Sequence, residues 1–309
     1  MHLELVVPGL LDLGTRTAGA RCASLELLVA RGRRDKATPQ SLESWLQQAF
    51  DQRGRLNAGP ISLLGAGGAP GDLAWTRADP VHLEVRRERV LMVPATALTV
   101  SQDEADALCD GLTRHFAGTL EFRALDPHRW CARLIAADMD LGDEPPLAAA
   151  GREATGGPED ALLTEVQMLL HAHPTNAARE ARGEPVLNSA WFWGSGRLPR
   201  GGPSRWQSVT SADPFALGLA RLAGATARKL PPNATAWLSQ SAEEGRHLVV
   251  LDPAETLERD WFAPLAAALR SGQIGMLTLH VPDAGLSFET VRGDLRRFWR
   301  RPKALASYV

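Results

Sequence analysis

One 24-residue stretch, from His173 to Gly196, gathers the side chains most able to do chemistry. Its sequence, HPTNAAREARGEPVLNSAWFWGSG, holds two asparagines, two arginines, a histidine and a Gly-Ser-Gly triplet. Arginines bind phosphate and carboxylate groups through paired hydrogen bonds, and small residues leave backbone N–H groups free to hold an anion. Residues of these types could therefore form a pocket for a small phosphorylated or carboxylate ligand. It would be built from His173, Asn176, Arg179, Arg182, Asn188, Gly194, Ser195 and Gly196.

A helix must position the first half of these residues. Pro174 suits the first position of a helix, and Gly183 suits the left-handed residue that follows its end. Between them, Asn176, Arg179 and Arg182 recur at i, i+3 and i+6, so they share roughly one helix face. His173 precedes the proline, where its ring could point at the backbone or at a ligand.

A strand must position the second half. Residues 187–193 (LNSAWFW) alternate as a strand does, and we expect residues 194–196 to form a tight turn after it. In open α/β sheets, ligands bind outside the carboxyl ends of strands. Residue types alone slightly favour the alternative of packing, in which the arginines are solvated, Asn188 caps a turn and the tryptophans fill the core.

The surrounding chain predicts an α/β fold, with a mainly parallel sheet flanked by helices. The clearest signal is a βαβ unit near the end, which favours parallel strands. A capping box at Ser101–Glu104 predicts a helix to about Phe116. The other expected elements are a strand at 2–7, helices at 22–32 and from Thr38-Pro39 to Phe50, a loop at 53–79, a strand or hairpin at 81–93, strands at 119–125 and 129–136, a helix at 161–173, and the βαβ unit of strand 247–252, helix 261–272 and strand 275–281.

Three parts are expected along the chain. Residues 1–136 form an N-terminal α/β part, within which 81–136 is a hairpin-rich α+β subdomain. Residues 137–160 are the longest polar, Gly- and Pro-rich stretch and are predicted to be a connector. Residues 161–309 form the C-terminal α/β part, which carries the motif at 169–196.

Net charge, cysteine spacing and apolar runs indicate which partners and which compartment to expect. The net charge is -2 over 309 residues, so no general basic field attracts nucleic acid or acidic lipid, and neither partner is expected. The three cysteines are scattered, which favours a reducing compartment, the cytoplasm. No run of about 18 apolar residues is present, so no membrane span is expected.

Two further charged clusters have ordinary explanations. Asp138, Asp140, Asp143 and Glu144 lack the spacing of a calcium loop and are interpreted as a solvated loop. Residues 294–302 (DLRRFWRRP) could be a patch for nucleic acid or another anionic partner. The preferred interpretation is the end of a basic amphipathic helix, with a solvated face and both aromatics packed inward.

The pattern L-L-x-x-H-P-x-N-x-x-R-x-x-x-G-x-x-x-x-N-x-x-W-x-W-G-x-G, from Leu169 to Gly196, resembles the archaeal type of cofactor-independent phosphoglycerate mutase. It resembles more closely a group of shorter proteobacterial proteins that are named regulatory proteins of the RpfE type. Residues 165–168, 261–265 and 296–302 also match that shorter group, so the resemblance to it covers most of the chain.

The resemblance implies an alkaline-phosphatase-like fold, in part, and a chemistry that uses two divalent metals and a phosphoryl-carrying serine. That chemistry requires a carboxylate at the end of the first strand. Pro8 stands at this position here, and only Gly9 and Asp12 remain of the pattern. His247 and His280 stand without the family's neighbouring ligands. No catalytic or metal-binding residue is therefore assigned, and no cofactor is expected.

Three hypotheses follow. The first is a non-catalytic, cytoplasmic regulatory or binding protein related to the mutases, which keeps the anion pocket and binds a small anionic metabolite. The second is a working mutase or phosphatase with an altered metal site, in which Asp12 and the 138–144 cluster bind a divalent metal such as manganese. The third is a scaffold in which residues 169–196 only pack and the interaction surface lies elsewhere, for example at the basic tail.

Overall fold

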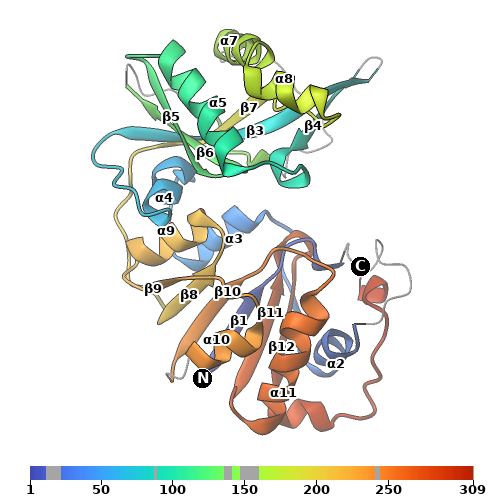
Figure 1. Ribbon diagram of the computed structural model, residues 1–309. Helices are drawn as coiled ribbons and strands as arrows, with labels where there is room; N and C mark the ends of the chain where they lie inside the picture. Colours follow the sequence, from blue (N-terminus) through green and yellow to red (C-terminus); the bar gives the residue numbers. More distant parts are fainter. Residues whose placement is uncertain (12–21, 87–88, 136–140, 147–159, 241–243, 309) are drawn as a thin grey trace. The chain divides into compact units, whose positions relative to one another are not determined.

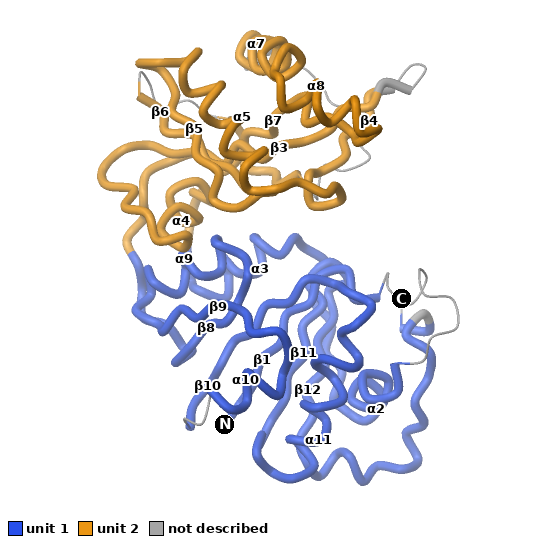
Figure 2. Tube along the Cα trace, in the orientation of Figure 1, with its two compact units in different colours: residues 1–52, 201–309 blue, residues 53–200 orange. Residues whose placement is uncertain are grey.

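The structure is a computed structural model, which describes residues 1–11, 22–86, 89–135, 141–146, 160–240 and 244–308. The chain forms two compact units (Figure 2). Unit 1 consists of Met1–Gln52 and Gly201–Val309, and unit 2 of Arg53–Arg200. This division differs from the expected one, because the hairpin-rich segment and the 169–196 motif belong to the same unit. Most of the expected connector at 137–160 lies outside the described residues.

Unit 1 is built on a seven-stranded sheet in the order β2-β12-β11-β1-β10-β8-β9 (Figure 1). The strands from β11 to β9 pair in parallel, and β12 and β2 add an antiparallel edge. The predicted βαβ unit is confirmed, but β1 lies between its two strands. The strands are β1 (His2–Val6), β2 (Arg33–Lys36), β8 (Ser208–Ser211), β9 (Thr226–Lys229), β10 (Arg246–Val250), β11 (Met276–Val281) and β12 (Leu286–Val291).

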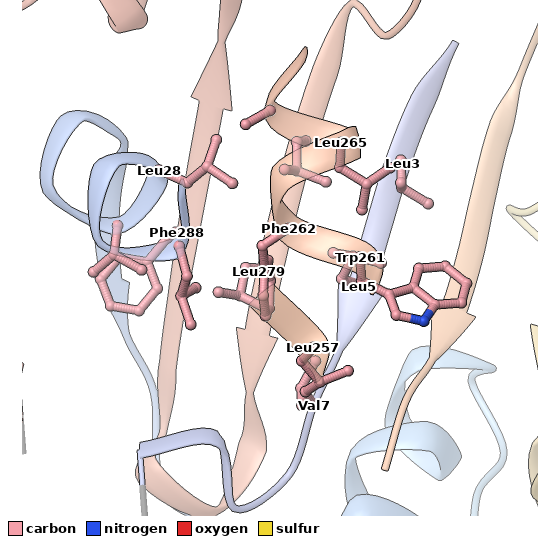
Figure 3. Close-up of a cluster of buried hydrophobic side chains, with 14 of the residues drawn as sticks. Leu3, Leu5, Val7, Leu28, Leu257, Trp261, Phe262, Leu265, Leu279 and Phe288 are labelled. Carbon is pink, nitrogen blue, oxygen red and sulfur yellow. The ribbon is translucent and has the colours of Figure 1, made fainter. Parts of the chain in front are cut away.

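The main core of unit 1 lies on one face of this sheet. Leu3 and Leu5 of β1 point into it, together with Leu28 of α2 and Leu265 of α11 (Figure 3). Trp237 of α10 belongs to the same core. On the other face, Trp45 and Phe50, from α3 and its end, pack on His280 and Trp206. The helices of unit 1 are α2 (Ala23–Arg31), α3 (Leu42–Ala49), α9 (Pro214–Leu222), α10 (Ala234–Gln240), a π-helical turn (Glu258–Phe262) and α11 (Ala263–Ser271).

Two predictions for unit 1 are wrong. Helix α3 begins at Leu42 and not at Thr38-Pro39, because the Ser41 side chain accepts a hydrogen bond from Ser44 N and caps it there. Residues 294–302 form no α-helix. A short 3₁₀ helix, η4 (Arg292–Arg296), is followed by turns.

Unit 2 is built on antiparallel strands around the long β3 (Figure 1), which pairs with β4, β6 and β7, while β5 pairs with β6. The predicted 81–93 hairpin and the Ser101–Glu104 capping box are both confirmed. The elements are α4 (Ala58–Gly65), β3 (Ala74–Arg86), β4 (Arg89–Pro94), a 3₁₀ turn (Ala95–Ala97), α5 (Gln102–His115), β5 (Leu120–Asp126), β6 (Arg129–Leu134), α7 (Asp160–His171), α8 (Pro174–Ala181) and β7 (Ser189–Gly196).

The predicted loop at 53–79 is only partly right: its glycine-rich stretch at 66–72 consists of turns and coil, but α4 and the start of β3 lie on either side of it. Helix α4 has a sequence with poor helix propensity, AGPISLLG, yet nearly all of it is buried. A Cβ added at Gly59 would come within 2.6 Å of the Thr76 backbone, so glycine permits the close approach of α4 to β3. None of the described helices has the length and apolarity that a bilayer crossing requires.

Candidate functional site

The residues of the expected pocket all lie in unit 2, and the first of them caps α8. Nδ1 of His173 accepts a hydrogen bond from Thr175 N at 3.3 Å. The ring packs on α5, where a Cβ at Gly111 would come within 2.8 Å of His173 Nε2. Burial lowers the pKa of His173, and the nearby charge of Arg114 lowers it further. His173 thus begins the helix and fills the contact between α8 and α5.

Asn176 is buried and uses its whole side chain on the backbone. Its Nδ2 donates to Leu170 O at 2.7 Å and to Leu187 O at 2.9 Å. Its Oδ1 accepts from Leu187 N at 3.0 Å. These bonds tie the end of α7 and the approach to β7 to helix α8.

The two arginines of α8 converge on Glu104 of α5. Arg179, only 1% exposed, donates to Pro185 O at 2.9 Å and to Glu104 Oε2 at 3.0 Å. Arg182 donates to Glu104 Oε1 at 2.6 Å and to Glu184 Oε2 at 2.8 Å. Burial alone would raise the pKa of Glu104, but the bonds from the Ser101 backbone and Arg182 lower it. Both guanidinium groups are therefore neutralised by carboxylates of this chain.

The remaining residues of the motif contact other elements. Asn188 exchanges two hydrogen bonds with the Leu83 backbone of β3, at 2.7 and 2.9 Å. The Gly-Ser-Gly triplet is the end of β7, so the predicted tight turn is wrong. Gly194, with φ of +61°, donates from its N–H to Gly142 O, and a Cβ there would come within 2.5 Å of Ala58 Cβ. Ser195 Oγ accepts from Leu141 N at 3.3 Å, and Gly196 abuts the Asn57 side chain.

The motif therefore forms two groups of contacts. The α8 residues lie against α5 and α7, whereas the residues at the end of β7 lie against α4 and residues 141–142. The six polar side chains of the expected pocket, those of His173, Asn176, Arg179, Arg182, Asn188 and Ser195, all have hydrogen-bond partners within the chain. This geometry favours the packing hypothesis for residues 169–196.

The carboxyl ends of the parallel strands in unit 1 carry aspartates. Asp213 follows β8, Asp252 follows β10 and Asp283 follows β11. Asp283 Oδ1 accepts from Gly9 N at 2.9 Å, beside the end of β1. Among the described residues, no group of three His, Cys, Asp or Glu side chains could hold a metal ion. Asp12, Asp138 and Asp140 lie outside the described residues, and Asp143 pairs with Arg55 at 3.3 Å.

A charged cluster lies on the sheet face opposite the main core of unit 1. Glu4 of β1 is aligned with Leu248 of β10 and Thr278 of β11, so all three share this face. Arg246 and His280 lie two residues along these neighbouring strands, diagonally from Glu4. The loop before β8 adds Arg205 and Trp206. We call Glu4, Arg205, Trp206, Arg246 and His280 the Glu4 cluster.

Glu4 is almost fully buried and has four partners. Its Oε1 accepts from Trp206 Nε1 at 3.1 Å and from Arg246 Nη2 at 2.8 Å. Its Oε2 lies 3.3 Å from His280 Nε2 and 3.4 Å from Arg205 Nη2. Burial by itself raises the pKa of Glu4, but the hydrogen bonds from His280 and Arg246 outweigh it and lower this pKa to about 2. The carboxylate is therefore ionised and fixes both arginines.

The two guanidinium groups combine a fixed position with access to solvent. The Arg205 and Arg246 side chains are 45% and 46% exposed. Arg205 also stacks on the Trp206 ring, 4.2 Å from its centroid. Burial lowers the pKa of Arg205, Glu4 raises it, and the like charge of Arg246 lowers it. A guanidinium group has five N–H donors. Among the described residues, the two guanidinium groups donate hydrogen bonds only to Glu4. The remaining donors are available to an external anion.

Comparison with solved structures shows what fold this is. The chain is similar to the PH0037 protein from Pyrococcus horikoshii, with a TM-score of 0.55 and 14% identity over 94% of this chain and 87% of that one. It is also similar to a cofactor-independent phosphoglycerate mutase from Thermoplasma acidophilum, with a TM-score of 0.48 and 19% identity over 99% and 94%. No family model and no curated protein match the sequence. The likeness to the PH0037 protein shows a shared α/β fold.

The Glu4 cluster was not predicted from the sequence, although part of its signal is there. The alternation in HLELVV places His2 and Glu4 on one face of a strand, opposite the leucines. An acidic residue inside an otherwise apolar strand needs a cation, because a buried lone carboxylate is costly. The identity of that cation depends on which strands and loops are neighbours, and alternation carries no such information.

Proposed function

We propose that this protein is a non-catalytic binding protein related to the phosphoglycerate mutases, and that it binds a small phosphorylated or carboxylate anion at the Glu4 cluster. One observation carries the proposal: Arg205 and Arg246 are held by the same buried carboxylate while their remaining donors face solvent. Preorganised guanidinium groups bind phosphate and carboxylate with little loss of side-chain entropy. The motif arginines are less suited, since Glu104 and Glu184 already occupy them.

The sequence supports the non-catalytic and regulatory parts of the proposal. Pro8 stands where the resemblance to the mutases requires a metal-binding carboxylate, and proline offers no ligand. The closer resemblance to regulatory proteins of the RpfE type suggests that binding, rather than turnover, is the activity. All three cysteines are free thiols, which agrees with the proposed cytoplasmic location.

Isothermal titration calorimetry with 3-phosphoglycerate and with inorganic phosphate tests the site. We expect Arg205→Gln and Arg246→Gln each to weaken binding by roughly tenfold or more, because each removes a charge-assisted hydrogen bond. Arg182→Gln is the matched control, since its side chain is 47% exposed and also ion-paired. Loss of binding in the control alone would move the site to the α8 motif. Absence of binding in the wild type would reject the proposal.

A metal-dependent mutase or phosphatase is the second candidate. It requires Asp12 and members of the acidic cluster at 138–144 as metal ligands, because the described residues include no group of three His, Cys, Asp or Glu side chains that could hold a metal ion. Turnover of 3-phosphoglycerate or of a chromogenic phosphoester in the presence of manganese would favour this candidate. If the protein shows no turnover with several divalent metals, and the purified protein contains no metal, the enzyme hypothesis is rejected in favour of the binding protein.

A further inference from the structure

Two neighbouring aromatic side chains near the end of the chain are exposed to solvent. Phe298 is 77% exposed and Trp299 is 66% exposed, against the prediction that both pack inward. Their ring centroids lie 5.2 Å apart at an interplanar angle of 83°. Scattered single apolar residues are ordinary on a surface, but adjacent large ones indicate an interaction site. They follow η4 in unit 1 and form a feature separate from the Glu4 cluster.

The charge around these rings is strongly positive. Residues 292–303 (RGDLRRFWRRPK) contain six basic side chains and one carboxylate, so the segment has a net charge of +5. Asp294 is occupied by Arg297 at 2.7 Å. Four basic side chains are exposed and have no ion pair among the described residues. They are Arg292, Arg296, Arg301 and Lys303. With Phe298 and Trp299 they make up what we call the aromatic–basic surface.

The segment that carries this surface is fixed to the end of α2. Arg297 Nη1 donates to Arg31 O at 3.2 Å, and Arg300 Nη1 donates to Gly32 O at 2.8 Å. Arg31 in turn donates to Leu295 O. Successive turns also fold the segment on itself, through the bond from Arg300 N to Arg297 O. These hydrogen bonds hold the exposed aromatic side chains in a defined position. Because the segment is already ordered, binding at this surface loses little conformational entropy.

We propose that the aromatic–basic surface binds the anionic face of a lipid bilayer. Reversible membrane attachment needs two signals, an apolar insertion and an electrostatic attraction to acidic headgroups, and this surface combines them. Basic residues near such a membrane each contribute about fivefold in affinity. The expectation of no membrane partner rested on the net charge of -2 for the whole chain, and the local charge here is opposite. Nearly perpendicular rings are poorly arranged to stack on successive bases of a single strand.

Co-sedimentation of the purified protein with vesicles tests this proposal. One set of vesicles is pure phosphatidylcholine, and the other contains equal parts of phosphatidylcholine and phosphatidylserine. We expect binding only to the second set, and weaker binding as salt is raised. The double variant Arg301→Gln/Lys303→Gln should bind roughly 25-fold more weakly, from about fivefold for each charge. Phe298→Ser/Trp299→Ser should lose roughly tenfold or more, since it removes the apolar insertion.

The matched control is Met168→Ser on α7, which removes another exposed apolar side chain, 69% exposed, from unit 2. It should bind the acidic vesicles as the wild type does. Three results would overturn the proposal. They are no binding of the wild type to acidic vesicles, binding of Phe298→Ser/Trp299→Ser as strong as that of the wild type, and a loss of binding in Met168→Ser as large as in the aromatic variant. Dimerisation in analytical ultracentrifugation, or binding of a single-stranded oligonucleotide, without vesicle binding would assign the surface to those partners instead.

Discussion

The side-chain amide of Asn176 pairs with the backbone of Leu187 as a neighbouring strand would, with one hydrogen bond of 2.9 Å and one of 3.0 Å. A third bond reaches Leu170 O at 2.7 Å. One buried side chain thus joins the end of α7, helix α8 and the approach to β7. The residue that the motif presents as a ligand-binding asparagine is a structural link between three segments.

Replacement of Asn176 by alanine should lower the free energy of unfolding by about 3 kcal/mol. The substitution removes the bonds that pair the buried N–H and C=O of Leu187, and each unpaired group costs about 1–3 kcal/mol. Leu170 O keeps its bond from His173 N. Urea unfolding should show a lower midpoint at an unchanged slope. Asn188→Ala serves as the comparison, because Asn188 is half-buried and makes two bonds, so its loss should be smaller. Equal stability of Asn176→Ala and wild type would contradict the role given to Asn176.

Local signals predicted the elements of the motif but not its partners. The proline after His173 and the glycine at 183 correctly predict where α8 begins and ends. Helical spacing correctly places Asn176 and Arg179 on one face, and both are buried. The spacing cannot tell that Glu104, 75 residues earlier, lies opposite that face. An arginine poised for an anion and an arginine neutralised by a distant glutamate have the same local sequence.

The partners of Glu4 in the Glu4 cluster could not be predicted from local sequence either. Period-two alternation indicates that Glu4 faces away from the leucine core, but the strand order β11-β1-β10 brings in His280 and Arg246. That order depends on contacts some 240 to 280 residues apart in the chain. The exposed Phe298 and Trp299 were mispredicted because amphipathic spacing was taken for an α-helix, whereas the chain there turns.

Replacement of Gly194 by alanine should destabilise unit 2 more than the same change at Gly183. Both glycines have positive φ, +61° and +72°, so both variants carry the cost of a left-handed alanine, roughly 1 kcal/mol. A Cβ at Gly194 also meets Ala58 Cβ at 2.5 Å, whereas nothing lies within 4 Å at Gly183. We expect an extra loss of about 1–3 kcal/mol from this overpacking, measured as the difference between the two unfolding midpoints. Equal losses would show that α4 moves to accommodate the methyl group.

The buried pair of Arg77 and Asp79 should be the most sensitive charged site in unit 2. Arg77 Nη2 lies 2.6 Å from Asp79 Oδ1, both side chains are nearly inaccessible, and Trp193 Nε1 donates to Asp79 Oδ2 at 2.8 Å. Asp79→Asn leaves the guanidinium without its counter-charge, which should cost about 3–5 kcal/mol.

Asp143→Asn is the control for that loss. It breaks an exposed ion pair with Arg55, and exposed pairs contribute below about 1 kcal/mol. Thermal unfolding of the two variants checks the contrast. A loss for Asp79→Asn as small as that for Asp143→Asn would mean that water reaches Arg77.

Stability should depend on the ionisation of Glu4 at low pH. Its pKa in the folded protein is about 2, below its ordinary value of 4.5, because His280, Arg246 and Arg205 favour the carboxylate. A depressed pKa stabilises the fold above the unfolded value, and that contribution is lost as the pH falls from about 4.5 towards 2. The shift corresponds to roughly 3 kcal/mol. Urea unfolding at pH 6 and at pH 3 should therefore show a smaller pH-dependent loss for Glu4→Gln than for the wild type, since the glutamine does not titrate. If the difference in unfolding free energy between Glu4→Gln and the wild type is the same at pH 6 and at pH 3, Glu4 does not titrate across this range.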